Sequence, residues 1–93
     1  MSRETAKQFL AMYLHTKGYR RTPERYAILD SVWNIEGSFD LNVLYNKLNE
    51  NPKFRISRAT VYNNVGLLVD AGLVVKNIDV RPYTFERAFN KNN

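Results

Sequence analysis

Apolar residues recur at helical spacing in four stretches of the chain. They are Ala6, Phe9, Leu10, Tyr13 and Leu14 within residues 4–17; Ile28, Leu29 and Val32 within 23–34; Leu41, Leu44, Tyr45 and Leu48 within 41–48; and Val61, Val65 and Leu68 within 58–71. Intervals of three and four residues place side chains on one face of an α-helix, which turns once in about 3.6 residues. The pattern therefore predicts four short helices, each burying one face.

Residues that favour helix ends mark the boundaries of these stretches. Side chains that cap a helix N-terminus precede helices at Thr22, Asp40 and Ser57, and residues that end a helix follow at Gly18, Pro52 and Gly72. A hydroxyl or carboxylate at the N-cap accepts a backbone N–H that has no partner within the helix, and Pro23 loses nothing at the first helical position. We expect the third and fourth helices to be joined by a short turn.

After Gly72 the pattern becomes typical of strands. Residues 73–78 and 83–87 are rich in β-branched and aromatic side chains, and 79–82 form a short connection that contains a proline. This predicts a two-stranded hairpin, which must pack on the helices because a lone hairpin is marginal in water. The predicted fold class is mainly α with a small β-hairpin, a winged helix-turn-helix.

Composition narrows the class of protein. The 93 residues contain no cysteine, which excludes a disulfide scaffold and thiolate-bound metal sites, and the length fits one domain. No apolar stretch approaches the roughly 20 residues of a membrane helix, and the N-terminus lacks the apolar segment of a signal peptide. We therefore expect a cytoplasmic protein with no membrane partner.

The net charge of +5 is unevenly distributed. Residues 1–25 carry six basic and two acidic side chains, residues 26–51 one and four, and residues 52–93 seven and three. We expect folding to gather the two basic ends on one face, with the acidic middle mainly on the helices behind it. Such a face is typical of nucleic-acid binding, although a solvated surface has the same composition.

The fourth predicted helix presents an outer face suited to a DNA major groove. With its apolar residues inward, it exposes Arg58, Ala59, Tyr62, Asn63 and Gly66, and no acid occurs before Asp70. Arginine binds phosphate or guanine, a tyrosine ring can contact a thymine methyl, and asparagine can bridge to adenine or phosphate. At the tip of the predicted hairpin, Arg81 can reach the backbone or a minor groove.

The sequence also bears on two alternatives to DNA binding, a protein-interaction module and an enzyme. A winged helix can serve as a protein-interaction module, which predicts an exposed apolar patch and no steep salt dependence of binding. An enzyme is disfavoured, because the sequence has one histidine, no glycine-rich phosphate loop and no carboxylate pair that the fold would bring into a pocket.

Four segments of the sequence resemble the N-terminal domain of the ferric uptake regulator family. They are residues 18–29 (Gly-Tyr-Arg-Arg-Thr-Pro-Glu-Arg-Tyr-Ala-Ile-Leu), Leu44-Tyr45, residues 56–62 (Ile-Ser-Arg-Ala-Thr-Val-Tyr) and residues 70–74 (Asp-Ala-Gly-Leu-Val). The resemblance implies a repressor of transcription that responds to a metal or to peroxide. It places Tyr62 on a base in the major groove, and Arg20 or Arg21 in the adjacent minor groove.

The DNA-binding residues expected from residue chemistry and resemblance combined are Arg20, Arg21, Ser57, Arg58, Ala59, Thr60, Tyr62, Asn63 and Arg81. One position departs from the family pattern. The residue after the family's tyrosine is usually arginine, whereas Asn63 follows Tyr62 here. A strong phosphate contact is therefore not expected at this position.

The resemblance also implies a second domain. Residues 1–89 are expected to form the DNA-binding domain, and 90–93 a frayed polar end that begins a hinge to a dimerisation and metal-binding domain. The full-length protein would use Fe(II), Zn(II) or Mn(II), and would bind an A·T-rich inverted repeat as a homodimer. The present chain would be a monomer or weak dimer.

No metal site is expected in the chain itself. Glu86 alone matches a family ligand, Ser38 stands where a histidine would be, and one carboxylate cannot hold a transition metal. The single histidine, His15, lies in the middle of the first predicted helix and is interpreted as an ordinary surface or core-edge residue.

Overall fold

The computed structural model describes residues 1–52 and 55–88, so the predicted frayed end at 90–93 lies outside the described residues. The elements are α1 (Arg3–Lys17), α2 (Pro23–Trp33), α3 (Leu41–Leu48), α4 (Arg58–Asp70), β1 (Val74–Asn77) and β2 (Thr84–Arg87). Helices followed by an antiparallel hairpin confirm the predicted winged helix-turn-helix. In the described part of the chain, no helix has the length and apolar character needed to cross a membrane.

Each helix begins at a side-chain cap. The cap oxygen accepts the backbone N–H three residues on in the pairs Ser2–Thr5 (3.1 Å), Thr22–Arg25 (3.4 Å), Asp40–Val43 (2.9 Å) and Ser57–Thr60 (3.1 Å). Three of these caps were predicted, and Ser2 was not. Because Ser2 caps α1, that helix starts one residue earlier than the predicted range of 4–17.

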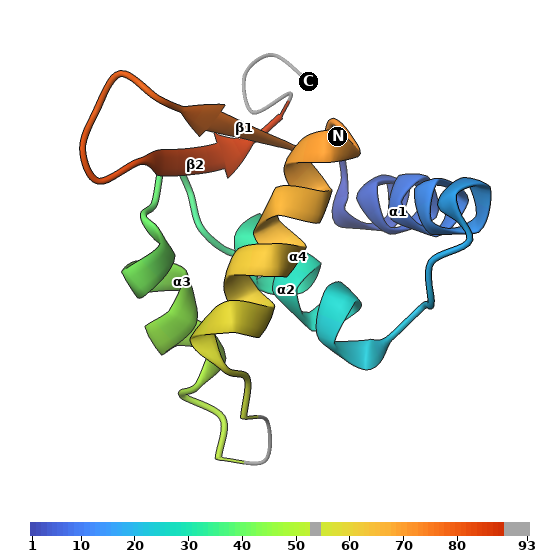
Figure 1. Cartoon of the computed structure of the whole chain (residues 1–93), viewed down its shortest axis with the longest axis horizontal. Helices are drawn as coiled ribbons and strands as arrows, with labels where there is room; N and C mark the ends of the chain where they lie inside the picture. The colour runs from blue at the N-terminus through green and yellow to red at the C-terminus, as the bar shows by residue number, and fades with distance from the viewer. Residues whose placement is uncertain (53–54, 89–93) are drawn as a thin grey trace.

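The buried stripe of α1 is narrower than predicted. Ala6, Leu10 and Leu14 are fully buried at intervals of four residues, while Tyr13 is half-buried and Phe9 is 48% exposed. The prediction of Phe9 as a core residue was therefore wrong. The physical reason is the position of α1 at the side of the domain, where it packs mainly on α2 (Figure 1).

Polar contacts also join α1 to α2. The Lys7 ammonium lies 3.4 Å from a carboxylate oxygen of Asp30, and the Arg3 guanidinium lies 3.8 Å from the same oxygen. His15 is exposed and lies in the last turn of α1, not in the middle of the helix as predicted.

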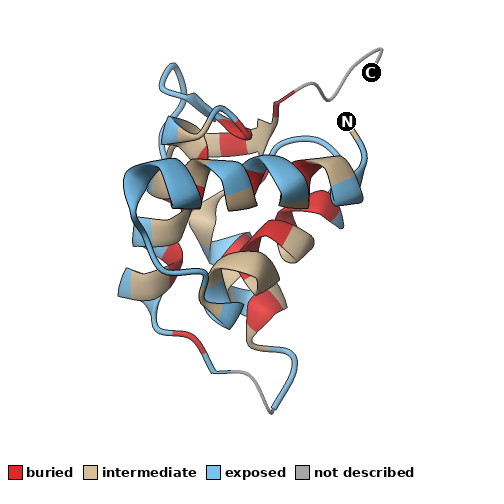
Figure 2. Ribbon diagram, turned by 90° about the vertical axis from the view of Figure 1, so that its right-hand side faces the viewer, coloured by how far each residue is buried: buried red, intermediate tan, exposed pale blue. Residues whose placement is uncertain are grey.

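The core lies between the four helices and the base of the hairpin. Figure 1 shows α4 in front of α2, with α1 on one side and α3 and the hairpin on the other. Figure 2 shows buried residues on the facing sides of the helices and exposed residues on their outer sides. The predicted inward residues of α2 and α4 are all buried, namely Ile28, Leu29, Val32, Val61, Val65 and Leu68. This packing turns the opposite side of α4 to solvent.

The hairpin is held to the helices by an additional bridge. β1 pairs antiparallel with β2 from Val74↔Arg87 to Asn77↔Thr84, so the strands are shorter than the predicted ranges of 73–78 and 83–87. Phe39, which precedes α3, pairs with Phe85 of β2 through two backbone hydrogen bonds of 2.8 Å. Their rings are stacked with centroids 6.2 Å apart, and both are buried.

The connection between α3 and α4 is residues 49–57, which is longer than the short turn predicted. Its two ends are joined by Asn49, whose side-chain oxygen accepts the Ile56 N–H at 3.1 Å. The amide nitrogen of the same side chain donates to the carbonyls of Ile56 at 3.3 Å and Tyr45 at 2.9 Å. The start of α4 is thereby fixed to the end of α3.

Candidate nucleic-acid interface

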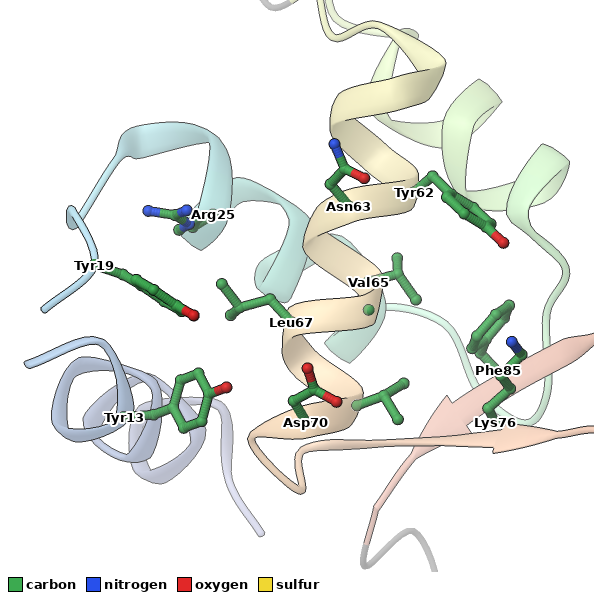
Figure 3. Close-up of a pocket in the computed structure, with 12 residues that line it drawn as sticks. Tyr13, Tyr19, Arg25, Tyr62, Asn63, Val65, Leu67, Asp70, Lys76 and Phe85 are labelled. Carbon is green, nitrogen blue, oxygen red and sulfur yellow. The ribbon is translucent and has the colours of Figure 1, made fainter. Parts of the chain in front are cut away.

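The outer face of α4 is exposed and begins at a well-formed cap. The Ser57 hydroxyl accepts the Thr60 N–H and donates to the Thr60 hydroxyl oxygen at 2.9 Å. Beyond this cap, Ala59, Asn63 and Gly66 are exposed, and Tyr62 is 58% exposed. The residues predicted to face outward from α4 therefore do so. Figure 3 shows Tyr62 and Asn63 pointing in different directions from α4.

Arg58 is exposed but held against α3. Its guanidinium donates to the side-chain oxygen of Asn42 at 2.6 Å and lies 4.2 Å from the centre of the Tyr45 ring. A guanidinium stacked on a ring and bonded through one nitrogen keeps further N–H donors for an anion. Arg58 therefore keeps donors for the phosphate or guanine contact that its charge suggests, and that contact stays a prediction. The two α3 residues that orient it were not identified from the sequence.

An apolar hollow of about 350 Å³ lies between α3 and α4. It is lined by Leu41, Tyr45, Arg58, Ala59, Val61 and Tyr62. Of the residues that line it, Tyr62 is also 58% exposed to solvent. Such a hollow can accept the methyl group of thymine, which projects into the major groove of DNA.

The segment between α1 and α2 lies next to α4. Arg20 and Arg21 lie on this segment, outside both helices, and both are exposed. The side chain of Arg25, in the first turn of α2, donates to the Arg20 carbonyl and, at 3.2 Å, to the side-chain oxygen of Asn64 on α4. The fold thus brings the basic segment near the helix that carries Tyr62.

A second hollow of about 580 Å³ runs along α4 between this segment and the hairpin (Figure 3). Its lining includes Tyr13 and Tyr19 at one side and Lys76 at the other. Asp70, the first acidic residue of α4, also lines it. Asp40 lines a third hollow, with Tyr62, so one acid of the middle segment does not lie behind the basic face as expected.

The hairpin carries basic side chains around one aromatic ring. The Arg81 guanidinium lies 4.6 Å from the centre of the Tyr83 ring, and the Lys76 ammonium lies 4.3 Å from it. Arg81 is exposed and also donates to the Ile78 carbonyl at 3.2 Å. A ring attracts a cation to its face, so both charges are held at the hairpin surface.

The described residues do not fit a metal ion. Within 1–52 and 55–88, no three histidine, aspartate or glutamate side chains come together. Glu86 is half-buried on β2. At the other family position, the exposed Ser38 has a hydroxyl in place of the imidazole that would serve as a ligand.

Sequence reasoning missed four residues that shape this surface. Asn42 and Tyr45 hold Arg58, and Arg25 and Asn64 join the basic segment to α4. A signal existed only for Arg25, since an arginine three residues after an N-cap lies within reach of the segment before the helix. The other three act across helices, which spacing along one helix cannot reveal.

Comparisons with known proteins agree with the fold described above. A family model described as the ferric uptake regulator family matches residues 16–92. The solved structure of the Helicobacter pylori ferric uptake regulator, reported to have three functional metal-binding sites, aligns with a TM-score of 0.84 at 13% identity. That alignment covers 95% of this chain and 59% of the other, and at this identity it shows the fold alone.

Two other solved structures share more sequence. PerR from Streptococcus pyogenes, described as a peroxide sensor and gene regulator, has 31% identity and a TM-score of 0.69, with 84% of this chain and 54% of that chain covered. A manganese uptake regulator has 30% identity and a TM-score of 0.65, with 84% and 57% covered. The chain spans between half and three-fifths of the length of these structures. A search of curated protein sequences gave no match.

Proposed function

The chain belongs to the ferric uptake regulator family, and from this premise we propose that it is a sequence-specific DNA-binding domain in which α4 enters the major groove. In the complex, Tyr62 contacts a base and Arg58 contacts phosphate or guanine. The Ser57–Thr60 cap and Ala59 lie at the groove edge, where the first backbone N–H groups of α4 face a phosphate. Asn63 adds a neutral contact.

Two further contacts flank α4 in this proposal. Arg20 or Arg21 enters the adjacent minor groove, where the negative potential of a narrow A·T-rich groove attracts a guanidinium. Arg81 at the hairpin lies on the DNA backbone. Contacts in two neighbouring grooves explain why the preferred site would be A·T-rich at its flank.

The observation that carries the proposal is the exposed face of α4. From Arg58 through Val69 the helix has no acidic residue, and its largest exposed side chain, Tyr62, borders an apolar hollow that is large enough to admit a methyl group. A solvated helix has no need to expose a tyrosine beside such a hollow. The exposed ring beside an apolar hollow therefore supports a role for Tyr62 in reading a base edge.

The proposal is tested on a duplex selected from a random DNA pool by the 93-residue chain. Tyr62→Ala is expected to weaken binding to the selected duplex by about 1–3 kcal/mol and to leave binding to scrambled DNA unchanged. Phe9→Ala is the matched control, because Phe9 is also an exposed aromatic but lies on α1. Fluorescence anisotropy gives both affinities. An equal loss on every sequence would refute the base contact.

Replacing single thymines of the selected duplex by uracil tests the apolar hollow. Uracil lacks the methyl group, so one substitution should weaken the wild-type chain and have little effect on Tyr62→Ala. Equal effects on the two proteins would contradict the methyl contact.

For the whole protein we propose a homodimeric, cytoplasmic transcriptional repressor that binds an inverted repeat and responds to Fe(II), Zn(II) or Mn(II), or to peroxide. Residues 1–89 would be its DNA-binding domain, and 90–93 would lead toward the domain that dimerises and holds the metal. Two linked half-sites raise affinity by effective concentration, so a single domain should bind weakly. Binding by the full-length regulator, with and without each metal, tests this proposal.

A protein-interaction module is the second candidate. The observation that favours it is the set of exposed aliphatic side chains on the hairpin and its connection, Val75, Ile78 and Val80. The two candidates differ in salt dependence, because DNA binding releases counterions and falls steeply between 50 and 200 mM salt. Titration of A·T-rich duplex at these two concentrations separates them.

A further inference from the structure

Arg25 joins three parts of the domain through one side chain. Its Nε donates to the side-chain oxygen of Asn64 on α4 at 3.2 Å, and its Nη1 donates to the carbonyl oxygen of Arg20. The same guanidinium lies 5.8 Å from the centre of the Tyr19 ring. Figure 3 shows Arg25 and Tyr19 close together beside α4. Because the guanidinium is planar and rigid, bonds from two of its nitrogens fix its orientation.

The α4 end of this connection is also fixed. The amide nitrogen of Asn64 donates to the Thr60 carbonyl at 2.8 Å, while its oxygen accepts from Arg25. Both ends of the amide are therefore used, and only one orientation of the side chain satisfies both bonds. Asn64 is half-buried, in contrast to its exposed neighbour Asn63.

Hydrogen bonds to the flanking helices hold the two ends of the segment. At one end, the Tyr19 N–H donates to the Leu14 carbonyl at 2.9 Å. At the other, the Thr22 hydroxyl caps α2. Between these ends lies Arg20, whose carbonyl oxygen accepts a hydrogen bond from the Arg25 guanidinium. That contact ties the part of the segment that carries the two exposed arginines to the rest of the domain.

We propose that Arg25 is a positioning residue which, through Asn64, holds the Arg20–Arg21 segment in a fixed relation to α4, so that minor-groove and major-groove contacts are made together. This inference rests on the proposed DNA-binding function and adds a residue to it. Ordering a flexible arginine at the moment of binding costs affinity, and a segment held in place beforehand avoids that cost.

The alternative role for Arg25 is a direct contact with phosphate. Two of its nitrogens already bond within the protein and its side chain is half-buried, which favours positioning. The roles make opposite predictions for Asn64, since a phosphate contact by Arg25 does not need the Asn64 oxygen.

The test is a double-mutant cycle between Arg20→Ala and Asn64→Ala on the selected duplex. Asn64→Ala leaves Arg25 and all charges in place, and alanine favours the helix. If Asn64 positions the segment, Arg20→Ala should reduce DNA affinity less in the Asn64→Ala background than in the wild type. The loss of affinity in the two backgrounds should differ by about threefold or more. Asn63→Ala is the matched control, an asparagine one residue away on the exposed face, and its effect should add to that of Arg20→Ala.

A second measurement does not depend on DNA. In the free chain, ¹⁵N relaxation of the Arg20 and Arg21 amides should report greater fast motion in Asn64→Ala and in Arg25→Met, with the amides of α4 unchanged. Arg25→Lys should rescue the segment only in part, since an ammonium cannot bond two acceptors in the fixed geometry of the guanidinium.

Three results would overturn the inference. They are additive effects of Asn64→Ala and Arg20→Ala, equal coupling for the Asn63 control, and unchanged motion of residues 20 and 21 in both variants. Failure of the proposed function looks different, because the wild-type chain would then bind no duplex with sequence preference while the relaxation result could still be obtained. A phosphate role for Arg25 would appear as a smaller salt slope in Arg25→Met with no effect of Asn64→Ala.

Discussion

Replacing Phe39 by alanine should destabilise the domain severely. Phe39 is 3% exposed and stacks on Phe85, which is 4% exposed, so truncation removes nearly the whole buried ring. Phe→Ala changes in cores cost about 3–5 kcal/mol, against a total stability of about 5–15 kcal/mol for a domain. The two backbone hydrogen bonds to Phe85 need no side chain, so the loss measures the ring contact.

Urea denaturation followed by tryptophan fluorescence is a suitable assay. Trp33 is the only tryptophan and is 7% exposed, so its emission should shift when the core opens. With a slope of about 2 kcal/mol per molar urea, a loss of about 4 kcal/mol lowers the midpoint by about 2 M. Val43→Ala is the control, because Val43 is 49% exposed on the nearby α3 and should change stability by less than about 0.5 kcal/mol.

A small effect would refute this account of the hairpin. If Phe39→Ala lowers stability by less than about 1 kcal/mol with an unchanged slope, the ring pair does not anchor the hairpin. If Phe39→Ala instead lowers stability by about 4 kcal/mol, with an unchanged slope and one cooperative transition, the hairpin and the helices unfold as one unit.

Three further outcomes are expected. Asn63→Arg should add a phosphate contact and make the slope of log affinity against log salt steeper by about one, and equal slopes in the variant and wild type would contradict this. Ser57→Ala should cost about 1 kcal/mol in urea denaturation through loss of the α4 cap, and an unchanged midpoint would show that water replaces the hydroxyl fully. Gly72→Ala should lower the free energy of unfolding by about 1–2 kcal/mol, because Gly72 has φ +80°, which strains a residue with a Cβ. No atom lies within 4 Å of the added Cβ, so a much larger loss would contradict this estimate by indicating a clash.

Local signals in the sequence were sufficient for the four helices and for three of their four N-caps. Thr22, Asp40 and Ser57 each cap the helix predicted for them, because capping depends only on residues within one turn. The hairpin was also predicted, since its strands are separated by few residues. These features need no knowledge of the rest of the fold.

Features that depend on distant residues were missed or misjudged. The pattern of α1 put Phe9 in the core, but the width of a buried stripe depends on how many elements surround the helix. The Phe39–Phe85 pair joins segments on either side of α3 and α4, which no periodicity indicates. The same limit applies to the surface: exposure of Arg58 followed from its helix, whereas its contact with Tyr45 required the packing of α3 on α4.

The hydrogen bonds of Asn49 give the domain a practical site for modification. Because one side chain joins Tyr45 and Ile56 at the two ends of the connection, extra residues placed between Asn51 and Pro52 should leave the start of α4 where it is. Lengthening a closed loop costs little, about 0.6 kcal/mol for each doubling of its length. A short peptide tag or fluorophore could be inserted there to follow the domain without altering either terminus.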